Sequence, residues 1–319
     1  MLSITTLKKR VLPVFILLLS ASCLYAQTEM DAIMMNKGQF CNGFMYTYSS
    51  WDHYWEGALK RNNQNLGTVS TQSVMYGANY GVKDNINVIA TVPYVWTKAS
   101  AGTLHGMKGI QDLSLFVKWR PLQRKMGNGK FSLFAIGGLS FPLSDYTPDF
   151  LPLSIGLRST TLSAKVMADY QAGNLFATGS AAYVYRNNIK IDREAYYTTE
   201  MHYTNEVQMP DAANFHFRAG FRNHRFIAEA VLNNWTTLGG FDITRNNMPF
   251  PSNRMNATTA GVNFKYVIPP VPALSLVAGG NSTVAGRNMG QATSVYGAVF
   301  YALDLGRKSK STSSSLKTN

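Results

Sequence analysis

The stretch GIQDLSLFVKWRPL, residues 109–122, decides the fold. Apolar side chains occupy every second position, and polar or charged side chains take most of the positions between them. Alternate residues of a β-strand point to opposite faces, whereas a helix would scatter the same residues around its circumference. The stretch therefore predicts a strand with one apolar face (Leu113, Leu115, Val117, Trp119) and one largely polar face (Asp112, Ser114, Phe116, Lys118, Arg120).

The same period of two recurs along the chain and predicts about twelve strands. Each segment has roughly 10–14 residues, close to the length that a tilted strand needs to cross a bilayer. The expected strands cover residues 40–55, 66–80, 86–96, 109–122, 130–142, 159–170, 175–187, 212–221, 225–236, 254–267, 273–283 and 291–304.

The expected connections alternate between short and long. Residues 83–85, 172–174 and 223–224 are tight turns, whereas residues 97–108, 143–158, 188–211 and 237–253 are long linkers. In bacterial outer-membrane barrels the short turns face the periplasm and the long loops face outward. The pattern predicts an all-β protein, a transmembrane antiparallel up-and-down β-barrel of about 12 strands.

Aromatic residues stand near the ends of nearly every expected strand. Tyrosine and tryptophan prefer the membrane–water interface, because the ring is apolar and its tip is polar. A soluble β-sandwich is the alternative, and it predicts shorter strands without rings at their ends. The expected aromatic belt comprises Trp51, Trp55, Tyr80, Tyr94, Trp96, Trp119, Tyr170, Tyr185, Trp235, Tyr266 and Tyr301.

The first 26 residues have the organisation of an export signal. Three basic residues (8–10) precede an apolar run (11–19) that is too short to span a bilayer as a helix, and Ala26 precedes the expected cleavage site. Cleavage before Cys23, as in a lipoprotein, is less favoured because Ser20 stands where an aliphatic residue is usual. Removal of the signal lowers the net charge from +13 to +10.

Composition excludes several classes of protein. Of the 319 residues, 45% are apolar and 15% are charged, which argues against a disordered polyelectrolyte. No apolar stretch after the signal approaches 18 residues, so no transmembrane helix is expected. Cys41 is the single cysteine after cleavage, which excludes a disulfide scaffold.

The polar strand faces are assigned to the lumen of the barrel. Charges there must pair or meet water, because isolated burial is costly. Ion pairs that brace the wall are the favoured role, and a basic excess that attracts anions such as carboxylates or phenolates is the second. The lumen-facing candidates are Asp112, Lys118, Arg120, Lys165, Asp169, Arg186, His216, Arg218, Glu229 and Lys265.

Other chemistries find little support in the sequence. Met30, Met34, Met35 and Met45, with Cys41 and His53, are too irregularly spaced to predict a metal site, and no metal or cofactor is expected. No phosphate loop or Gly-x-Ser-x-Gly elbow occurs, so no catalytic residue is assigned. The basic residues are dispersed, which argues against nucleic-acid binding.

Three short motifs carry a family resemblance. Val92-Pro93-Tyr94, the run 109–113 leading into Lys118-Trp119-Arg120, and the run 137–143 resemble outer-membrane barrels of the phenol-degradation meta-pathway type, distant relatives of the long-chain fatty-acid transporters. The motif match covers residues 86–143, and the end of the signal resembles a Bacteroidetes export signal. The resemblance implies a Gram-negative outer-membrane channel for small apolar or aromatic compounds, with the particular substrate left open. The chain departs from many outer-membrane proteins by continuing past Tyr301.

These features divide the chain into a signal (1–26), a short N-terminal segment (27–39), a barrel (40–305) and a basic, serine-rich tail (306–319). The N-terminal segment is too short for a large plug but long enough to form a small constriction in the lumen. We expect a porin-like transporter for passive passage of small apolar or amphipathic solutes, with the lipid bilayer and these solutes as partners. The alternatives are a surface-interaction barrel that works through loops 188–211 and 237–253, and a barrel-wall hydrolase that depends on His216. The sequence leaves the oligomeric state open.

Overall fold

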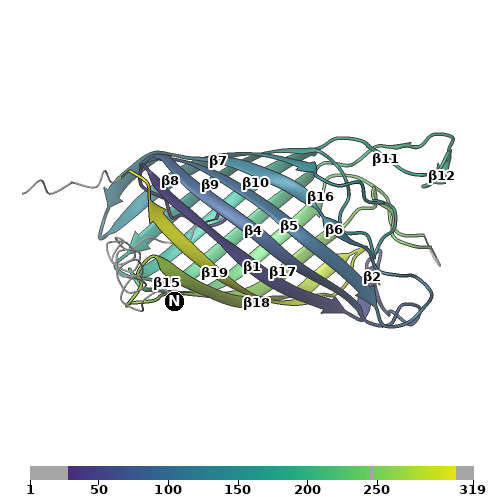
Figure 1. Ribbon diagram of the computed structural model, residues 1–319. Coiled ribbons are helices and arrows are strands. Elements are labelled where there is room, and N and C mark those ends of the chain that lie inside the picture. Colours follow the sequence, from purple (N-terminus) through teal and green to yellow (C-terminus); the bar gives the residue numbers. More distant parts are fainter. Residues whose placement is uncertain (1–27, 245–246, 307–319) are drawn as a thin grey trace, which may run out of the picture.

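The computed structural model describes residues 28–244 and 247–306. The expected signal and almost all of the expected C-terminal tail lie outside these residues. The described chain forms a closed antiparallel barrel of twelve strands, each paired with its neighbours along the sequence (Figure 1). The predicted fold class is therefore confirmed. Within the described ranges, no helix is long and apolar enough to span a membrane.

The barrel closes where its first strand pairs with its last, from Gln39 opposite Asp304 to Ser50 opposite Thr293. The twelve barrel strands are β1 (Gln39–Trp51), β4 (Val69–Lys83), β5 (Ile86–Ala99), β7 (Asp112–Met126), β8 (Gly129–Pro142), β9 (Thr161–Ala172), β10 (Leu175–Arg186), β15 (Ala212–Arg222), β16 (Phe226–Thr237), β17 (Asn256–Val267), β18 (Leu274–Arg287) and β19 (Thr293–Asp304).

Seven short strands complete the described structure. One of them, β6 (Lys108–Ile110), adds to β5 beyond the point where β7 stops pairing with it. The other six form three two-stranded sheets: β2 (His53–Glu56) with β3 (Leu59–Asn62), β11 (Ile189–Lys190) with β14 (Glu206–Val207), and β12 (Tyr196–Tyr197) with β13 (Met201–His202), the last two pairs within one long hairpin.

The first expected strand, 40–55, is wrong at its C-terminal end. The barrel strand stops at Trp51, and residues 53–62 form a separate hairpin. This hairpin folds against the end of β18, where Tyr54 bridges Gly290 and the ring of Trp55 lies over the Cα of Gly286. A Cβ atom at Gly286 would lie 2.4 Å from that ring, so the hairpin is seated where β18 lacks a side chain.

The two faces of the barrel wall differ sharply in polarity. Val117, Val166 and Phe217 are 51%, 57% and 51% exposed, whereas their sequence neighbours Lys118, Lys165 and Arg218 are at most 8% exposed. Large exposed apolar side chains are distributed around the outside over all twelve strands. A continuous apolar surface of this size is unfavourable in water. The barrel therefore has an apolar exterior and keeps most charged side chains of its wall inside.

The connections define two ends of the barrel. The turn end carries the connections 84–85, 127–128, 173–174, 223–225 and 268–273, and the loop end carries 52–68, 100–107, 143–160, 187–211, 238–255 and 288–292. The hairpin that contains β11 and β12 projects beyond the barrel at the loop end (Figure 1).

One long loop, 143–160, folds back into the barrel at the loop end. The hydroxyl of Tyr146 donates to Asp112 Oδ1 over 2.6 Å, and Thr97 Oγ1 donates to the carbonyl of Leu153 over 2.6 Å. Ile155 packs with Tyr146 and Val95 in a buried cluster. The loop narrows the mouth at this end.

Candidate functional site

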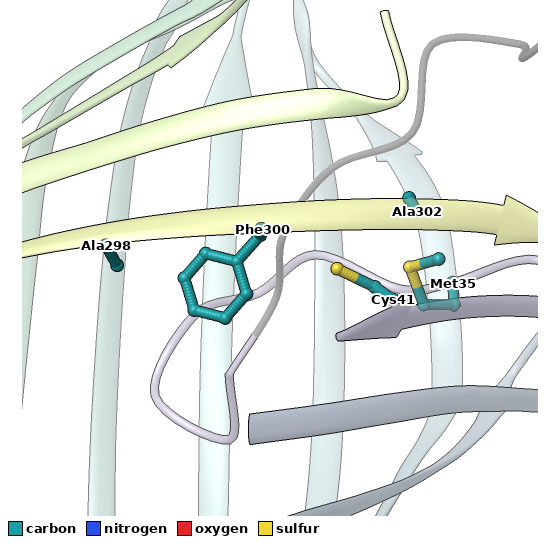
Figure 2. Close-up of a cluster of buried hydrophobic side chains, with 5 residues drawn as sticks. All are labelled: Met35, Cys41, Ala298, Phe300 and Ala302. Atoms are coloured by element: carbon teal, nitrogen blue, oxygen red, sulfur yellow. The ribbon is translucent and has the colours of Figure 1, made fainter. Parts of the chain in front are cut away.

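The N-terminal segment lies inside the lumen. It enters at the turn end, where the backbone N–H of Lys37 donates to Asp84 Oδ1 over 2.9 Å and that of Gly38 donates to the carbonyl of Gly81 over 2.8 Å. Residues 28–36 then fold back into the barrel, and the buried Met35 packs beside Cys41 next to β19 (Figure 2). The segment is therefore built into the interior of the barrel.

Lys118 anchors this segment to the wall. Its Nζ donates to the carbonyl oxygens of Thr28, Asp31 and Ile33 over 3.0, 2.6 and 2.9 Å, and Asp31 Oδ1 lies 3.3 Å away. Lys118 is 0% exposed. An ammonium group has three N–H donors, and here all of them point at backbone or carboxylate acceptors of the segment.

Two further ion pairs join neighbouring or nearby strands on the inner face of the barrel wall. Arg218 pairs with Glu229, whose Oε1 also accepts from Asn263 Nδ2 over 2.6 Å. Arg222 lies 3.2 Å from Asp169, and its guanidinium carbon is 3.7 Å from the centroid of the Phe176 ring. Each acid is thus held by an arginine on another strand, which braces the wall.

The ion pairs leave basic groups that carboxylates do not neutralise. Lys165 Nζ donates to the thioether sulfur of Met30 over 3.3 Å, and among the described residues no carboxylate lies within 4.0 Å of it. The Nε atoms of Arg218 and Arg222 are also buried, and they have no hydrogen-bond partner among the described residues. A positive potential and unused N–H donors therefore coexist in the lumen.

Three cavities lie inside the barrel around segment 28–36. The first, of 490 Å³, and the second, of 340 Å³, share Met30, Met45 and Phe300 in their linings. The third, of 480 Å³, lies at the turn end and shares Ile33 and Arg222 with the first. Segment 28–36 lines all three, so it is the element that divides the lumen.

The chain matches one protein family over most of its length. The family model described as "Putative MetA-pathway of phenol degradation" matches residues 61–297. The chain belongs to this family. The resemblance drawn from the short motifs is therefore confirmed, and it extends far beyond residues 86–143. No match was found among curated protein sequences.

Solved structures that resemble this chain include outer-membrane barrels. The COG4313 outer membrane channel of Pseudomonas putida F1 is similar at a TM-score of 0.69 and 11% identity, covering 88% of this chain and 100% of that one. The translocator domain of the autotransporter NalP of Neisseria meningitidis reaches a TM-score of 0.44 at 12% identity, covering 93% and 97%. A FadL homologue of Pseudomonas aeruginosa reaches 0.36 at 9% identity, covering 85% and 90%. The first likeness shows that this member of the phenol-degradation family has the fold of an outer-membrane channel.

The structure places the charged residues expected in the lumen in different surroundings. Asp112 meets the inward-folded loop, Arg120 lines the cavity at the turn end, and Arg186 lines a different cleft outside the lumen cavities. Arg186, the last residue of β10, keeps the inward parity of its strand but lines none of the three lumen cavities, and its place in the lumen stays a prediction. The other seven residues are buried or line a lumen cavity: Lys118, Lys165, Asp169, His216, Arg218, Glu229 and Lys265.

Sequence reasoning missed two residues of these networks. Arg222 lies on the inward face of β15, one position beyond the expected strand 212–221, so extending the period of two would have found it. Asp31 lies in a segment without periodicity, and no local pattern indicates that it meets Lys118.

The aromatic belt is placed only in part on the outer surface. Tyr80, Tyr94, Trp119, Tyr185 and Tyr266 are exposed large side chains, and Trp96 contacts Tyr94 at 6.1 Å between ring centroids. On their strands, Tyr170 and Tyr301 share the outward face with exposed neighbours.

Three tryptophans of the expected belt lie elsewhere. Trp55 is buried over Gly286, and Trp51 lies over Gly290 and packs with buried Val69. Trp235 lines the first lumen cavity. A belt position for these three is corrected, because Trp235 falls on the inward parity of β16 and the other two cover glycine positions at the loop end.

The pairing of β15 with its two neighbouring strands shows which residues surround His216. His216 stands opposite Ser180 on β10 and opposite Asn233 on β16, but within the described residues no hydrogen bond joins His216 to Ser180. Nucleophilic catalysis requires such a contact between the nucleophile and its base. Among residues 28–244 and 247–306, no group of three or more His, Cys, Asp or Glu side chains is arranged to hold a metal ion.

Proposed function

We propose that this protein is an outer-membrane channel for passive passage of small amphipathic solutes, preferentially anions with an apolar body such as aromatic carboxylates or phenolates. The three cavities inside the barrel carry the proposal. The bilayer would cover the apolar exterior, and the expected export signal at 1–26 agrees with this location.

The lining of the first cavity matches this solute class. Arg218 and Lys265 supply positive charge, whereas Met45, Met75 and Phe300 supply apolar contact. Methionine adapts its shape to different apolar groups, which suits a channel with more than one solute. No nucleotide-binding loop is present in the sequence, which supports a passive mechanism.

Conductance tests the proposal directly. Purified protein reconstituted in a planar bilayer should pass ions with a preference for chloride over potassium, and proteoliposomes should admit benzoate faster than benzylammonium. A tight electrical seal under all conditions would contradict the channel and favour the surface-interaction alternative.

That alternative has one specific observation in its favour. The projecting hairpin exposes large side chains at its tip: Tyr203 is 86% exposed, and Tyr197 and Met201 are about half exposed. A surface-interaction protein would lose partner binding on shortening of this hairpin while its conductance stayed at zero.

A charge on the outer wall should weaken the folding stability of the barrel in a membrane. Phe217 lies halfway along β15 on the outward face, and we expect Phe217→Arg to cost about 2–4 kcal/mol of folding free energy in a bilayer. Phe226→Arg, at the turn-end start of β16, should cost about 1 kcal/mol or less because the interface is wet. Urea unfolding in lipid vesicles measures both, and equal costs would contradict the assigned membrane level.

A further inference from the structure

A cleft outside the lumen occupies the loop end of the barrel. Its volume is 1210 Å³, and its walls come from the end of β10, the hairpin 188–211 and the loop 238–252. None of its lining residues lines the three lumen cavities. The proposed solute pathway therefore makes no use of it.

The polar groups of this cleft are held in place by the protein. Asp211 accepts from the hydroxyl of Tyr183 and from the backbone N–H of Arg186, the latter over 3.0 Å. Glu206 Oε1 accepts from Asn188 Nδ2 over 2.8 Å. These bonds orient two carboxylates before any ligand arrives, which lowers the entropic cost of binding.

One donor in the cleft has no partner. Arg186 is 6% exposed, and its Nε donates to the carbonyl of Pro210 over 2.5 Å. Its Nη2 is buried and has no hydrogen-bond partner among the described residues. An unpaired buried donor is unfavourable, and a small rotation of the guanidinium group would offer this N–H to an oxygen atom in the cleft.

Two tyrosine rings form an apolar platform beside these polar groups. Tyr183 and Tyr185 occupy alternate positions of β10, line the cleft and are 50% and 49% exposed. Side chains two residues apart on a strand are about 6.6–6.8 Å apart along it. Tyrosine faces are rigid and apolar with a polar rim, so they suit a ligand with the same mixed character.

The lining also limits the charge of the ligand. Glu206 and Asp211 face a single arginine, so the cleft has no basic excess that would attract a phosphate or another strong anion. Hydroxyl groups both donate and accept hydrogen bonds, and they can therefore use the carboxylates and the guanidinium together. The hydroxyl of Tyr196, which also lines the cleft, donates to the backbone carbonyl of Glu206 over 3.1 Å.

We propose that this cleft binds a neutral oligosaccharide, with sugar rings stacked on Tyr183 and Tyr185 and ring hydroxyls bound by Arg186, Glu206 and Asp211. The apolar C–H faces of the sugar rings contact the phenol rings, and the hydroxyls complete the bond of Arg186 Nη2. This site is independent of solute passage, because it shares no lining residue with the lumen cavities.

Binding to the detergent-solubilised full chain tests the proposal. The probes are maltotriose, cellotriose, laminaritriose and mannotriose, followed by saturation-transfer NMR and calorimetry. At least one trisaccharide should bind, and Tyr185→Ala and Arg186→Gln should each weaken it by about fivefold or more. Tyr94→Ala, another exposed tyrosine of the outer wall away from the cleft, is the matched control and should leave binding unchanged.

Other outcomes would overturn the proposal. One is that none of the four sugars binds at a ligand concentration of about 10 mM, which corresponds to very weak affinity. A second is that the two cleft variants bind sugar as tightly as the wild type. A third is that only lipopolysaccharide binds. The last result would assign the cleft to the lipid headgroup. Tyr185 makes no hydrogen bond within the described residues, so Tyr185→Ala keeps the test valid if Arg186→Gln misfolds. A wild-type protein that conducts no ions but still binds a trisaccharide would contradict the proposed channel and leave the proposed sugar site supported.

Discussion

Replacing Lys118 with methionine is expected to raise the single-channel conductance in a planar bilayer at least severalfold. Methionine keeps the length of the side chain but removes the charge and all the donors that hold the carbonyls of Thr28, Asp31 and Ile33. Breaking a buried ion pair by removing one partner costs about 3–5 kcal/mol, because the other charge is left unpaired. Asp31 would be that charge, and the segment that divides the lumen would leave the wall.

The control for this variant lies on the same strand. Lys125 is exposed near the turn end of β7, so Lys125→Met removes the same charge without touching the segment and should leave the conductance unchanged. A chain without residues 28–35 should match Lys118→Met, which separates release of the segment from collapse of the barrel. Equal conductance in the wild type, in Lys118→Met and in the chain without residues 28–35 would show that the segment does not restrict the pathway.

Replacing Arg218 with glutamine is expected to shift ion selectivity strongly from anions toward cations. The change removes one positive charge and leaves Glu229 unneutralised in a narrow, weakly polarisable lumen. Unpaired charges in such a pore set the preference for ions of one sign. Reversal potentials under a salt gradient measure the effect, which should be largest at low ionic strength because salt screens charges.

A double-mutant cycle provides the control for Arg218. Glu229→Gln alone should increase anion selectivity, and the double variant should return close to the wild type because its net charge is restored. Unchanged selectivity in both single variants would place this ion pair outside the ion pathway. A double variant as cation-selective as Arg218→Gln would indicate that geometry, and not charge, sets the preference.

Several features of the fold follow from local patterns in the sequence. The period of two fixes which residues of a strand share a face, and this rule holds for any strand whatever its neighbours. Lys118, Arg218 and Lys265 were placed correctly on the polar face by this rule alone, since Val117, Phe217 and Phe264 are the exposed residues beside them. Parity also places Trp235 inward, and reading its ring as part of the belt ignored that rule.

Other features depend on contacts between distant parts of the chain. The sequence predicts that strand 40–55 continues to Trp55, but Gly286 at the end of β18 and Gly290 in the following connection leave a flat surface on which the hairpin after Trp51 packs. Arg186 lies on the polar parity of its strand, yet β10 ends at this residue and the carbonyl of Pro210 draws it into the cleft. No pattern within either segment encodes these partners.

The sequence by itself determined the strands, their polar and apolar faces and the alternation of short and long connections, because each of these is set by residues one or two positions apart. The tertiary structure decided what fills the interior and how the lumen is divided. Lys118 and Asp31 are separated by 87 positions, and only closure of the barrel brings the ammonium group to the folded-back segment. Such a contact is favourable only when burial, charge and backbone acceptors coincide in space, which no local spacing along the chain specifies.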